Sequence, residues 1–276
     1  MFKRMVLFLF CTSLLAFSAV SCTAGSGSKS GGKEPEKPWK LVWNDEFDGP
    51  NGTAVDSSKW KSETGNNGGW GNAELEYYTD SVNNCYQENG NLIIKAIKEE
   101  KEGYDYTSAR IITQGKFDFK YGKIEMKAKL PRGNGIWPAF WMLGSSFDTA
   151  GWPKCGEIDI MEHIGKMPSK VHGTLHAMGY SGNAGITDSI KSKTSLYDNY
   201  HTYTLEWNEK GLKWYFDGKR YHEVDKEEID SGIWPFDDKF FILLNLAVGG
   251  YWPGYPDESS QFPQTYTIDY VRVYQQ

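Results

Sequence analysis

The chain has 276 residues, with 30 Lys and Arg against 36 Asp and Glu and a net charge of −6. This mild acidity argues against a nucleic-acid surface or a clamp for acidic polymers. A mean hydropathy of −0.58, with 30 glycines and 15% aromatic residues, excludes a multispanning membrane protein, a disordered chain and a coiled coil. The composition favours an all-β domain with a sugar-binding surface.

The first residues have the pattern of an export signal. Lys3 and Arg4 precede an apolar stretch over residues 5–20 that ends in small residues. A membrane helix is the alternative, but the stretch is short and no further span follows. Ordinary cleavage would use the small residues before Cys22, whereas lipoprotein cleavage would leave Cys22 as an acylated N-terminus. The segment resembles a bacterial lipobox, although Ala19 stands where Leu is usual.

Residues 22–38 contain Gly, Ser, Lys, Glu, Pro and other small residues. Such a segment does not bury a core and behaves as a flexible tether. A tether directly after a cysteine favours lipidation. We therefore expect a lipoprotein-type signal peptide over residues 1–21, a lipid anchor at Cys22, and an exported, membrane-anchored lipoprotein in the outer membrane or at the cell surface.

Two cysteines, Cys85 and Cys155, remain in the part that we expect to fold. Export would permit a disulfide between them, but two buried free thiols are the favoured interpretation. The cysteines lack the spacing of a metal site.

From Trp39 onward, no helical periodicity extends over ten residues, and alternation of period two predicts strands instead. An apolar segment over 240–247 is typical of a strand covered on both faces, and only residues 226–229 have room for a helical turn. Many short strands joined by Gly, Pro and Asn indicate a two-sheet β-sandwich of jelly-roll type, forming a single domain over residues 39–276. The predicted strands cover residues 92–97, 116–121, 123–130, 201–207, 212–216 and 220–222, with a hairpin turn at Asp217-Gly218.

Three acidic residues lie in one strand-like, apolar segment. Glu157 and Asp159 are two residues apart and point to the same face. Glu162 is five residues from Glu157, which in a regular strand would place it on the opposite face. One extra residue in a β-bulge, most naturally Met161, restores the parity and puts all three acids on one side.

Such an arrangement suits glycoside hydrolysis. Glu157 and Glu162 can lean together to about 5 Å between carboxyl groups, the spacing of a retaining glycosidase. Three close carboxyl groups do not all ionise near neutral pH, which leaves one ionised nucleophile beside one protonated acid. The alternatives are a solvated acidic edge and a metal site made of the same acids with His163.

Several segments, in order along the chain, resemble glycoside hydrolase family 16, the laminarinase and lichenase family of endo-β-glucanases. The acidic segment resembles the bulged form of its catalytic signature. The resemblance implies a concave substrate cleft on the sandwich, with Glu157 as nucleophile, Glu162 as general acid/base and Asp159 as the residue that tunes the nucleophile. The segments are residues 43–47, 70–79, 135–144, 157–162 and 269–274.

Pyranose rings present apolar faces that flat aromatic side chains complement. Trp137 and Trp141 lie four residues apart, hence on one face of their strand, and the resemblance places both near the scissile sugar. Burial in the core is the alternative. Trp152, in a loop before the acids, and Trp252, in a glycine-rich segment, are further candidate platforms.

Three polar residues match substrate-binding positions of the family. Asn72 and Arg110 correspond to residues that hydrogen-bond sugars on the non-reducing side, and His176 corresponds to a histidine beyond the cleavage point. An ordinary surface cation is the alternative for Arg110, and a core histidine is the alternative for His176.

The resemblance implies no cofactor for catalysis but a structural calcium ion, held mainly by backbone oxygens. The matching positions are Glu46, Gly90 and Asp269. Oxygen ligands suit calcium.

The favoured function is endo-acting hydrolysis of internal β-1,3 or β-1,4 bonds of β-glucans, such as laminarin or mixed-linkage glucan, with retained stereochemistry. We expect a monomer whose partners are the polysaccharide and, through Cys22, a membrane. A non-catalytic glucan-binding lectin and a family sibling acting on another galactan or glucan remain alternatives, and the linkage preference stays open.

Overall fold

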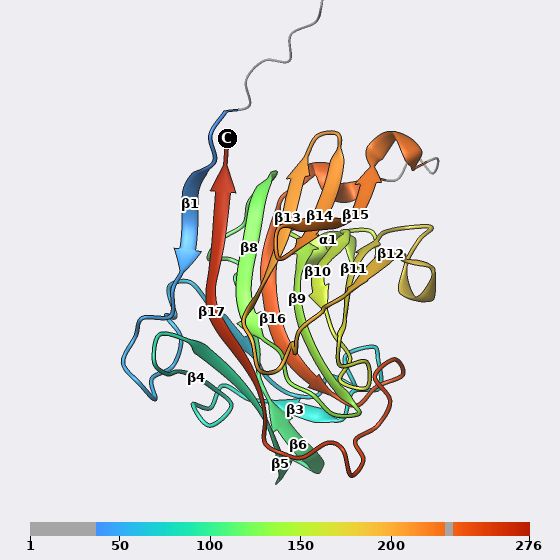
Figure 1. Cartoon of the computed structure of the whole chain (residues 1–276). Helices are drawn as coiled ribbons and strands as arrows, with labels where there is room; N and C mark the ends of the chain where they lie inside the picture. Colours follow the sequence, from blue (N-terminus) through green and yellow to red (C-terminus); the bar gives the residue numbers. More distant parts are fainter. Residues whose placement is uncertain (1–36, 230–233) are drawn as a thin grey trace, which may run out of the picture. The chain divides into compact units, whose positions relative to one another are not determined.

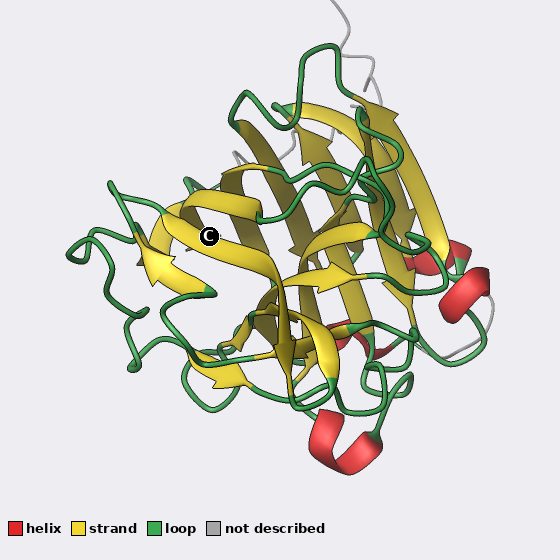
Figure 2. Cartoon of the chain, turned by 90° about the horizontal axis from the view of Figure 1, so that it is seen from below, coloured by secondary structure: helices red, strands yellow, loops and turns green. Residues whose placement is uncertain are grey.

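The computed structural model describes residues 37–229 and 234–276. Within these ranges the chain is built almost wholly of strands and loops with a few short helical turns (Figures 1 and 2). The predicted signal peptide, Cys22 and nearly all of the predicted tether lie outside the described residues. No helix in the described ranges is long and apolar enough to cross a bilayer.

The first sheet is the larger one. In the described ranges it has ten strands, and its main path runs β15-β14-β13-β8-β17-β5-β6-β3, with β1 on β17 and β4 on β5. Figure 1 shows β1, β17 and β8 side by side. The strands are β1 (Lys40–Asp45), β3 (Glu76–Tyr78), β4 (Cys85–Gln87), β5 (Leu92–Lys101), β6 (Tyr104–Ser108), β8 (Gly122–Lys129), β13 (His201–Asn208), β14 (Gly211–Phe216), β15 (Lys219–Asp225) and β17 (Gln264–Gln275).

The second sheet has seven strands among the described residues, in the order β12-β11-β10-β9-β16-β7-β2. Its strands are β2 (Lys61–Glu63), β7 (Arg110–Ile112), β9 (Ile136–Gly144), β10 (Glu157–Glu162), β11 (Lys170–His176), β12 (Ile186–Lys191) and β16 (Phe240–Val248). The helical turns are α1 (Phe147–Ala150), η1 (Gly182–Ala184), η2 (Lys226–Glu228) and η3 (Pro235–Asp237).

The core lies between the two sheets. Alternate residues of β8, such as Ile124 and Met126, are buried and join Phe140 of β9 and Ile158 of β10 in one apolar cluster. All residues of β16 are buried, as predicted for a strand covered on both faces. The all-β sandwich predicted from the alternation is confirmed, because two sheets that each hide one apolar face must pack together.

Two local predictions are confirmed. Asp217 and Gly218 have φ values of 48° and 72° and join β14 to β15 in a tight hairpin, where positive φ at both central residues matches the strand twist. The segment Lys226–Glu228 forms the expected helical turn.

The strand predicted over residues 116–121 is wrong. Lys116 and Phe117 belong to a turn whose amides bond to the carbonyl of Thr113, and only Phe119 forms an isolated bridge, to Phe240. The alternation there serves aromatic packing, since the Phe117 ring stacks on Trp43 at 4.9 Å. An alternating pattern reports which side chains are buried, and here no neighbouring strand completes the ladder.

Cys85 and Cys155 are both free and buried. The favoured interpretation of two buried thiols is therefore confirmed. Burial raises the pKa of Cys85 to about 12, so that its thiol stays protonated and unreactive.

Candidate active site

A β-bulge interrupts β10 between the acidic residues. Against β9, Asp159 pairs with Trp141 and Met161 pairs with Phe140, which leaves Ile160 as the extra residue. Ile160 and Met161 are both buried in the core. The predicted bulge is thus confirmed, but its extra residue is Ile160 and not Met161, because Met161 pairs with Phe140. Two consecutive inward residues return Glu162 to the face that carries the other acids.

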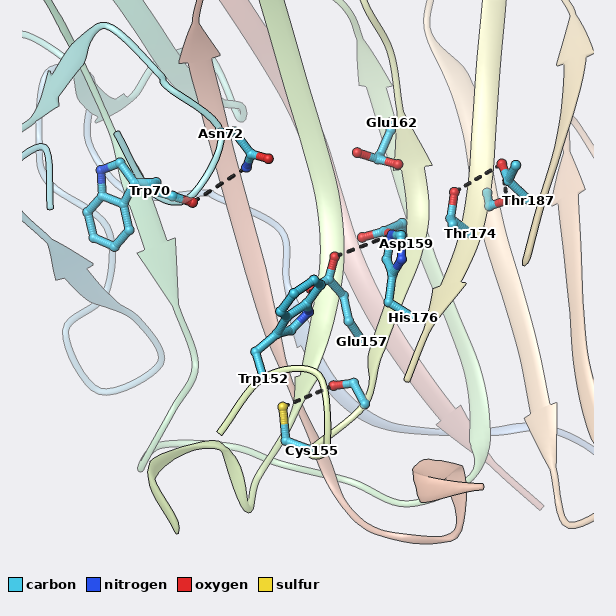
Figure 3. Close-up of polar contacts among 12 residues, drawn as sticks. Trp70, Asn72, Trp152, Cys155, Glu157, Asp159, Glu162, Thr174, His176 and Thr187 are labelled. Carbon is cyan, nitrogen blue, oxygen red and sulfur yellow. Dashed lines mark hydrogen bonds and ion pairs between the residues drawn. The ribbon is translucent and has the colours of Figure 1, made fainter. Parts of the chain in front are cut away.

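Figure 3 shows Glu157, Asp159 and Glu162 as one row of carboxyl groups along β10. Two indoles hold the outer members of the row. The Trp152 Nε1 donates to Glu157 Oε2 at 2.7 Å, and the Trp137 Nε1 donates to Glu162 Oε1 at 3.2 Å. One oxygen of each outer acid is therefore fixed by an uncharged donor, while the other oxygen stays available for chemistry.

His176 lies beside Glu157 and Asp159. Its partner across the β10–β11 ladder is Glu157, and its Nε2 is 3.2 Å from Asp159 Oδ2 and 3.8 Å from Glu157 Oε1. The ligand-type atoms of these three residues all lie within 4.8 Å of one another. The histidine belongs to the acid row, so the alternative of a core histidine is wrong.

Burial governs the protonation of the row. Desolvation, followed by the charge of Asp159, raises the pKa of Glu157 to about 8, and desolvation raises that of Asp159 to about 8. Desolvation and the neighbouring Asp159 hold the pKa of Glu162 well above its usual range. At least one of the acids therefore retains a proton near neutral pH, as predicted, and the alternative of a solvated acidic edge is wrong.

The backbone of the row rests on a core tryptophan. The Trp214 Nε1 of β14 donates to the carbonyl oxygen of Asp159 at 2.8 Å, and its side chain is fully buried. A side chain at Gly173 would meet the Trp214 ring at 2.5 Å. The first sheet thus supports the strand that carries the acids.

Arg110 is enclosed between two aromatic side chains. Its guanidinium lies 4.5 Å from the Trp70 ring centroid and 4.9 Å from that of Trp141, and its Nε is 2.5 Å from Glu63 Oε2. The side chain is only 12% exposed, so the alternative of an ordinary surface cation is wrong. Trp141 in turn donates through Nε1 to Asn245 Oδ1 at 2.8 Å.

Aromatic side chains also lie beside Glu162, at the other end of the row. Trp252 meets Trp137 edge-on at 5.4 Å and His172 edge-on at 5.0 Å. The carbonyl oxygen of Trp252 accepts a hydrogen bond from Lys166 Nζ at 2.7 Å. Trp137 and Trp252 therefore form one platform beside Glu162, while Trp152, with 48% of its surface exposed, flanks Glu157.

Several residues of this face carried no predicted role. His172 pairs with Glu162 across the ladder and was assigned no function from the sequence. Trp70 and Asn245 were also missed. Asn245 had one signal, because it is the only polar residue in the apolar segment 240–247.

The metal site predicted as an alternative with His163 is wrong. His163 is buried, and its Nδ1 lies 2.8 Å from the carbonyl oxygen of Lys170. The histidine that accompanies the acids is His176.

The predicted calcium positions lie in or beside the first sheet. Asp45 pairs with Val271, so Glu46 follows directly beside β17, the strand that contains Asp269. The Asp269 carboxylate is 2.6 Å from Lys127 Nζ, and the carboxylate of Glu46 pairs with Arg272. A calcium ion fits this set only through backbone oxygens and an Asp269 carboxylate released from Lys127.

Comparison with known proteins places this row of acids in a family. A sequence profile of glycosyl hydrolases family 16 matches residues 71–272. The chain belongs to this family. It is 41% identical over 274 residues to a beta-glucanase of Rhodothermus marinus, covering 95% of this chain and 93% of that protein. It is 40% identical to glucan endo-1,3-beta-glucosidase A1 of Niallia circulans, over 86% of this chain but only 38% of that longer protein.

Among solved structures, the laminarinase catalytic domain of Thermotoga maritima superposes with a TM-score of 0.82 at 50% identity, covering 87% of this chain and 99% of that domain. This chain is thus a glycoside hydrolase of family 16 with the jelly-roll fold of its neighbours. The family needs no catalytic cofactor.

Proposed function

We propose that this chain is an endo-acting β-glucanase that hydrolyses internal β-1,3 or β-1,4 glucosidic bonds with retained stereochemistry. The observation that carries the proposal is the row of Glu157, Asp159 and Glu162, brought to one face by the bulge of β10. Family membership and the glucanase names of its relatives support the substrate class.

In the first step, Glu157 attacks the anomeric carbon of the glucosyl unit, and the bond to the leaving oxygen breaks. Glu162 gives its proton to that oxygen, which leaves as a hydroxyl group. In the second step Glu162, now ionised, takes a proton from water, whose oxygen attacks the same carbon and releases Glu157. The high pKa of Glu162 suits a group that must arrive protonated near neutral pH.

In this mechanism Asp159 takes up the proton that it shares with Glu157 before the nucleophile attacks. Glu157 and Asp159 are hydrogen-bonded to each other, so one proton serves both groups. Held on Asp159, that proton donates to Glu157 and leaves the nucleophile charged. His176, 3.2 Å from Asp159 Oδ2, restrains the Asp159 side chain.

The aromatic side chains supply the binding surface. Trp137 and Trp252 lie beside Glu162, whereas Trp141 and Trp70 enclose Arg110. These rings offer apolar faces to pyranose rings, and Asn72, Arg110 and His176 offer polar groups to the hydroxyls.

Azide rescue tests the roles of the two glutamates. Glu157→Gly should lose at least about a thousandfold in kcat, and added azide should enter the vacated space and give an α-glucosyl azide. Glu162→Ala should give a β-glucosyl azide, because azide then attacks the covalent intermediate from the opposite face. The same product anomer from both variants would contradict the assignment.

Digestion of laminarin, barley β-glucan, lichenan and agarose with product sizing tests the substrate class. Mixed oligosaccharides early in the reaction indicate internal cleavage. Binding of laminarin without release of reducing ends would indicate a lectin, and cleavage of agarose alone would indicate a sibling specificity.

Anchoring is a second proposal, supported by the signal-like residues 1–21 and by Cys22 before the predicted tether. The enzyme would then be an exported lipoprotein in the outer membrane or at the cell surface. Radiolabelled palmitate should enter the native chain and not Cys22→Ser, and the variant should appear in the soluble fraction. Equal labelling of both would contradict the proposal.

We also propose a structural calcium ion at Glu46, Gly90 and Asp269, and a monomeric enzyme. The oxygen atoms that these residues offer are the ligands that calcium prefers, and they support the proposal. Light scattering after size exclusion tests the monomer, and a mass of twice that of the processed chain would contradict it.

A further inference from the structure

A buried pair of carboxyl groups lies behind Asn72 and Trp141. Glu76 is 0% exposed and Glu74 is 7% exposed, and the two side chains are hydrogen-bonded to each other. Glu76 Oε2 accepts a hydrogen bond from the Val248 amide at 2.6 Å, whereas Glu76 Oε1 is buried without any donor. Since two ionised carboxylates in contact repel each other, the proton of the pair belongs on Glu76 Oε1, and Glu74 is the ionised acceptor.

Glu74 collects hydrogen bonds from both sides. The Asn72 Nδ2 donates to its Oε1 at 3.1 Å, and the hydroxyl of Tyr78 donates to its Oε2 at 3.2 Å. The Asn72 amide nitrogen is thereby held inward, which leaves Asn72 Oδ1 free to accept a hydrogen bond from a sugar hydroxyl.

The chain of donors continues to the aromatic surface. Tyr78 has one hydroxyl hydrogen, which Glu74 receives, so Tyr78 accepts from Asn245 Nδ2 at 3.0 Å. That direction fixes the Asn245 side-chain amide and leaves its Oδ1 as the acceptor for Trp141 Nε1 at 2.8 Å. Every donor from Trp141 inward therefore points toward the Glu74 carboxylate.

The charged and titratable groups that face the pair are few. Burial raises the pKa of Glu74, although its hydrogen bonds and the charge of Arg110 oppose that rise. Burial also raises the pKa of Glu76 and of Tyr78, both well above their usual ranges. Arg110 is itself paired with Glu63. Near neutral pH the proton on Glu76 thus removes one buried charge, while Arg110 balances the charge on Glu74.

We propose that Glu74 and Glu76 are positioning residues for glucan binding: the Glu74 carboxylate, with a proton held on Glu76, fixes the orientation of Asn72 and, through Tyr78 and Asn245, of Trp141. The inference rests on the proposed function, in which Asn72 and Trp141 contact the glucan. Neither glutamate touches the acid row, so the pair acts on affinity and not on the chemical step.

Isosteric variants test the direction of the hydrogen bonds. Glu74→Gln places an amide where two donors require an acceptor, and we expect KM for laminarin to rise about tenfold with kcat within about twofold. In Glu76→Gln an N–H group replaces the O–H group as donor, and we expect KM within about twofold of native. The matched charge control is Glu88→Gln, at an exposed residue.

Calorimetric titration of laminaritetraose into proteins that also carry Glu157→Gln gives the affinity without turnover. The pair gives up its proton as the pH rises, so the Kd should rise more steeply with pH when Glu76 is present than in Glu76→Gln, where Asp159 and Glu162 still titrate. If Glu74→Gln does not fold, Tyr78→Phe breaks the same chain at the next link and should raise Kd by a similar factor.

An unchanged Kd in Glu74→Gln, or in Tyr78→Phe where Glu74→Gln does not fold, would overturn the inference. So would a Glu76→Gln variant as impaired as Glu74→Gln, because the direction of the hydrogen bonds would then not matter. If the native chain binds the oligosaccharide without cleaving it, the proposed function fails and the titration still decides the role of the pair. If it binds none, both proposals fail.

Discussion

Gly156, the residue before Glu157, allows a test of how the backbone positions the Glu157 carboxyl group. Its φ is +80°, and a Cβ placed there would lie 2.7 Å from Pro235 Cγ and 3.0 Å from Phe240 Cζ. Gly218, in the hairpin turn between β14 and β15, offers a control, since its φ is +72° and a Cβ would meet nothing within 4 Å. Both alanine variants strain the backbone at a positive φ, and only Gly156→Ala adds a steric clash.

The magnitudes follow from these two terms. The left-handed conformation costs alanine about 1–2 kcal/mol, so Gly218→Ala should lose about that much free energy of unfolding. The contact with a rigid proline ring and a buried phenylalanine adds about 1–3 kcal/mol at Gly156. A difference of about 2 kcal/mol corresponds to a difference in Tm of about 4–8 °C for a domain of this size.

Urea denaturation followed by tryptophan fluorescence measures both losses, and a thermal scan checks the order of the midpoints. Gly156→Ala should be less stable than Gly218→Ala and should also lose kcat, because Glu157 is the next residue. Equal free energies of unfolding for the two variants would refute the steric argument.

Three further predictions concern the acids, the core and the calcium site. Asp159→Asn should abolish activity. Because the folded-state pKa of about 8 lies above the unfolded value, the native chain loses stability as the pH rises, so the free energy of unfolding of the variant minus that of the native chain should be at least about 1 kcal/mol higher at pH 8 than at pH 5. An equal difference at both pH values, measured by urea denaturation, would contradict this. Trp214→Phe should lower the free energy of unfolding by about 2–4 kcal/mol and kcat about tenfold, since it leaves the Asp159 carbonyl without its donor. The control Trp207→Phe loses a hydrogen bond to the carbonyl of Phe236 and should lose similar stability while keeping kcat. Millimolar calcium should raise the Tm of the native chain and not of Asp269→Asn, and a chelator-insensitive Tm would contradict calcium binding.

Much of the fold could be predicted from side-chain alternation because sandwich strands hide one face and expose the other. Strand 123–130 and the apolar segment 240–247 correspond closely to β8 and β16. The segment 116–121 failed because other aromatic rings cover Phe117 and Phe119, while only Phe119 bridges to a neighbouring strand. Alternation alone does not distinguish these two ways of hiding a side chain.

The acid row could be predicted because its three residues lie within six positions of one strand, and the strand periodicity, with one bulge, decides their faces. The contacts of Glu76 and Asn245 are not local: Glu76 bonds to Val248, 172 residues along the chain, and Asn245 bonds to Tyr78, 167 residues away. Only the pairing of strands in space brings these groups together, so the sequence offered a polar residue in an apolar segment and no partner for it.

The single inserted residue at Ile160 also has a genetic consequence. One codon is the smallest insertion or deletion that keeps a gene in frame, and at this point it decides which side of the sheet a carboxyl group occupies. Losing that codon would turn either Glu162 or the Glu157–Asp159 pair toward the apolar interior while leaving every acidic residue in the sequence. A search for the three acidic residues alone would therefore not detect the loss. One mutational event could remove or restore the catalytic arrangement without altering a single acidic residue.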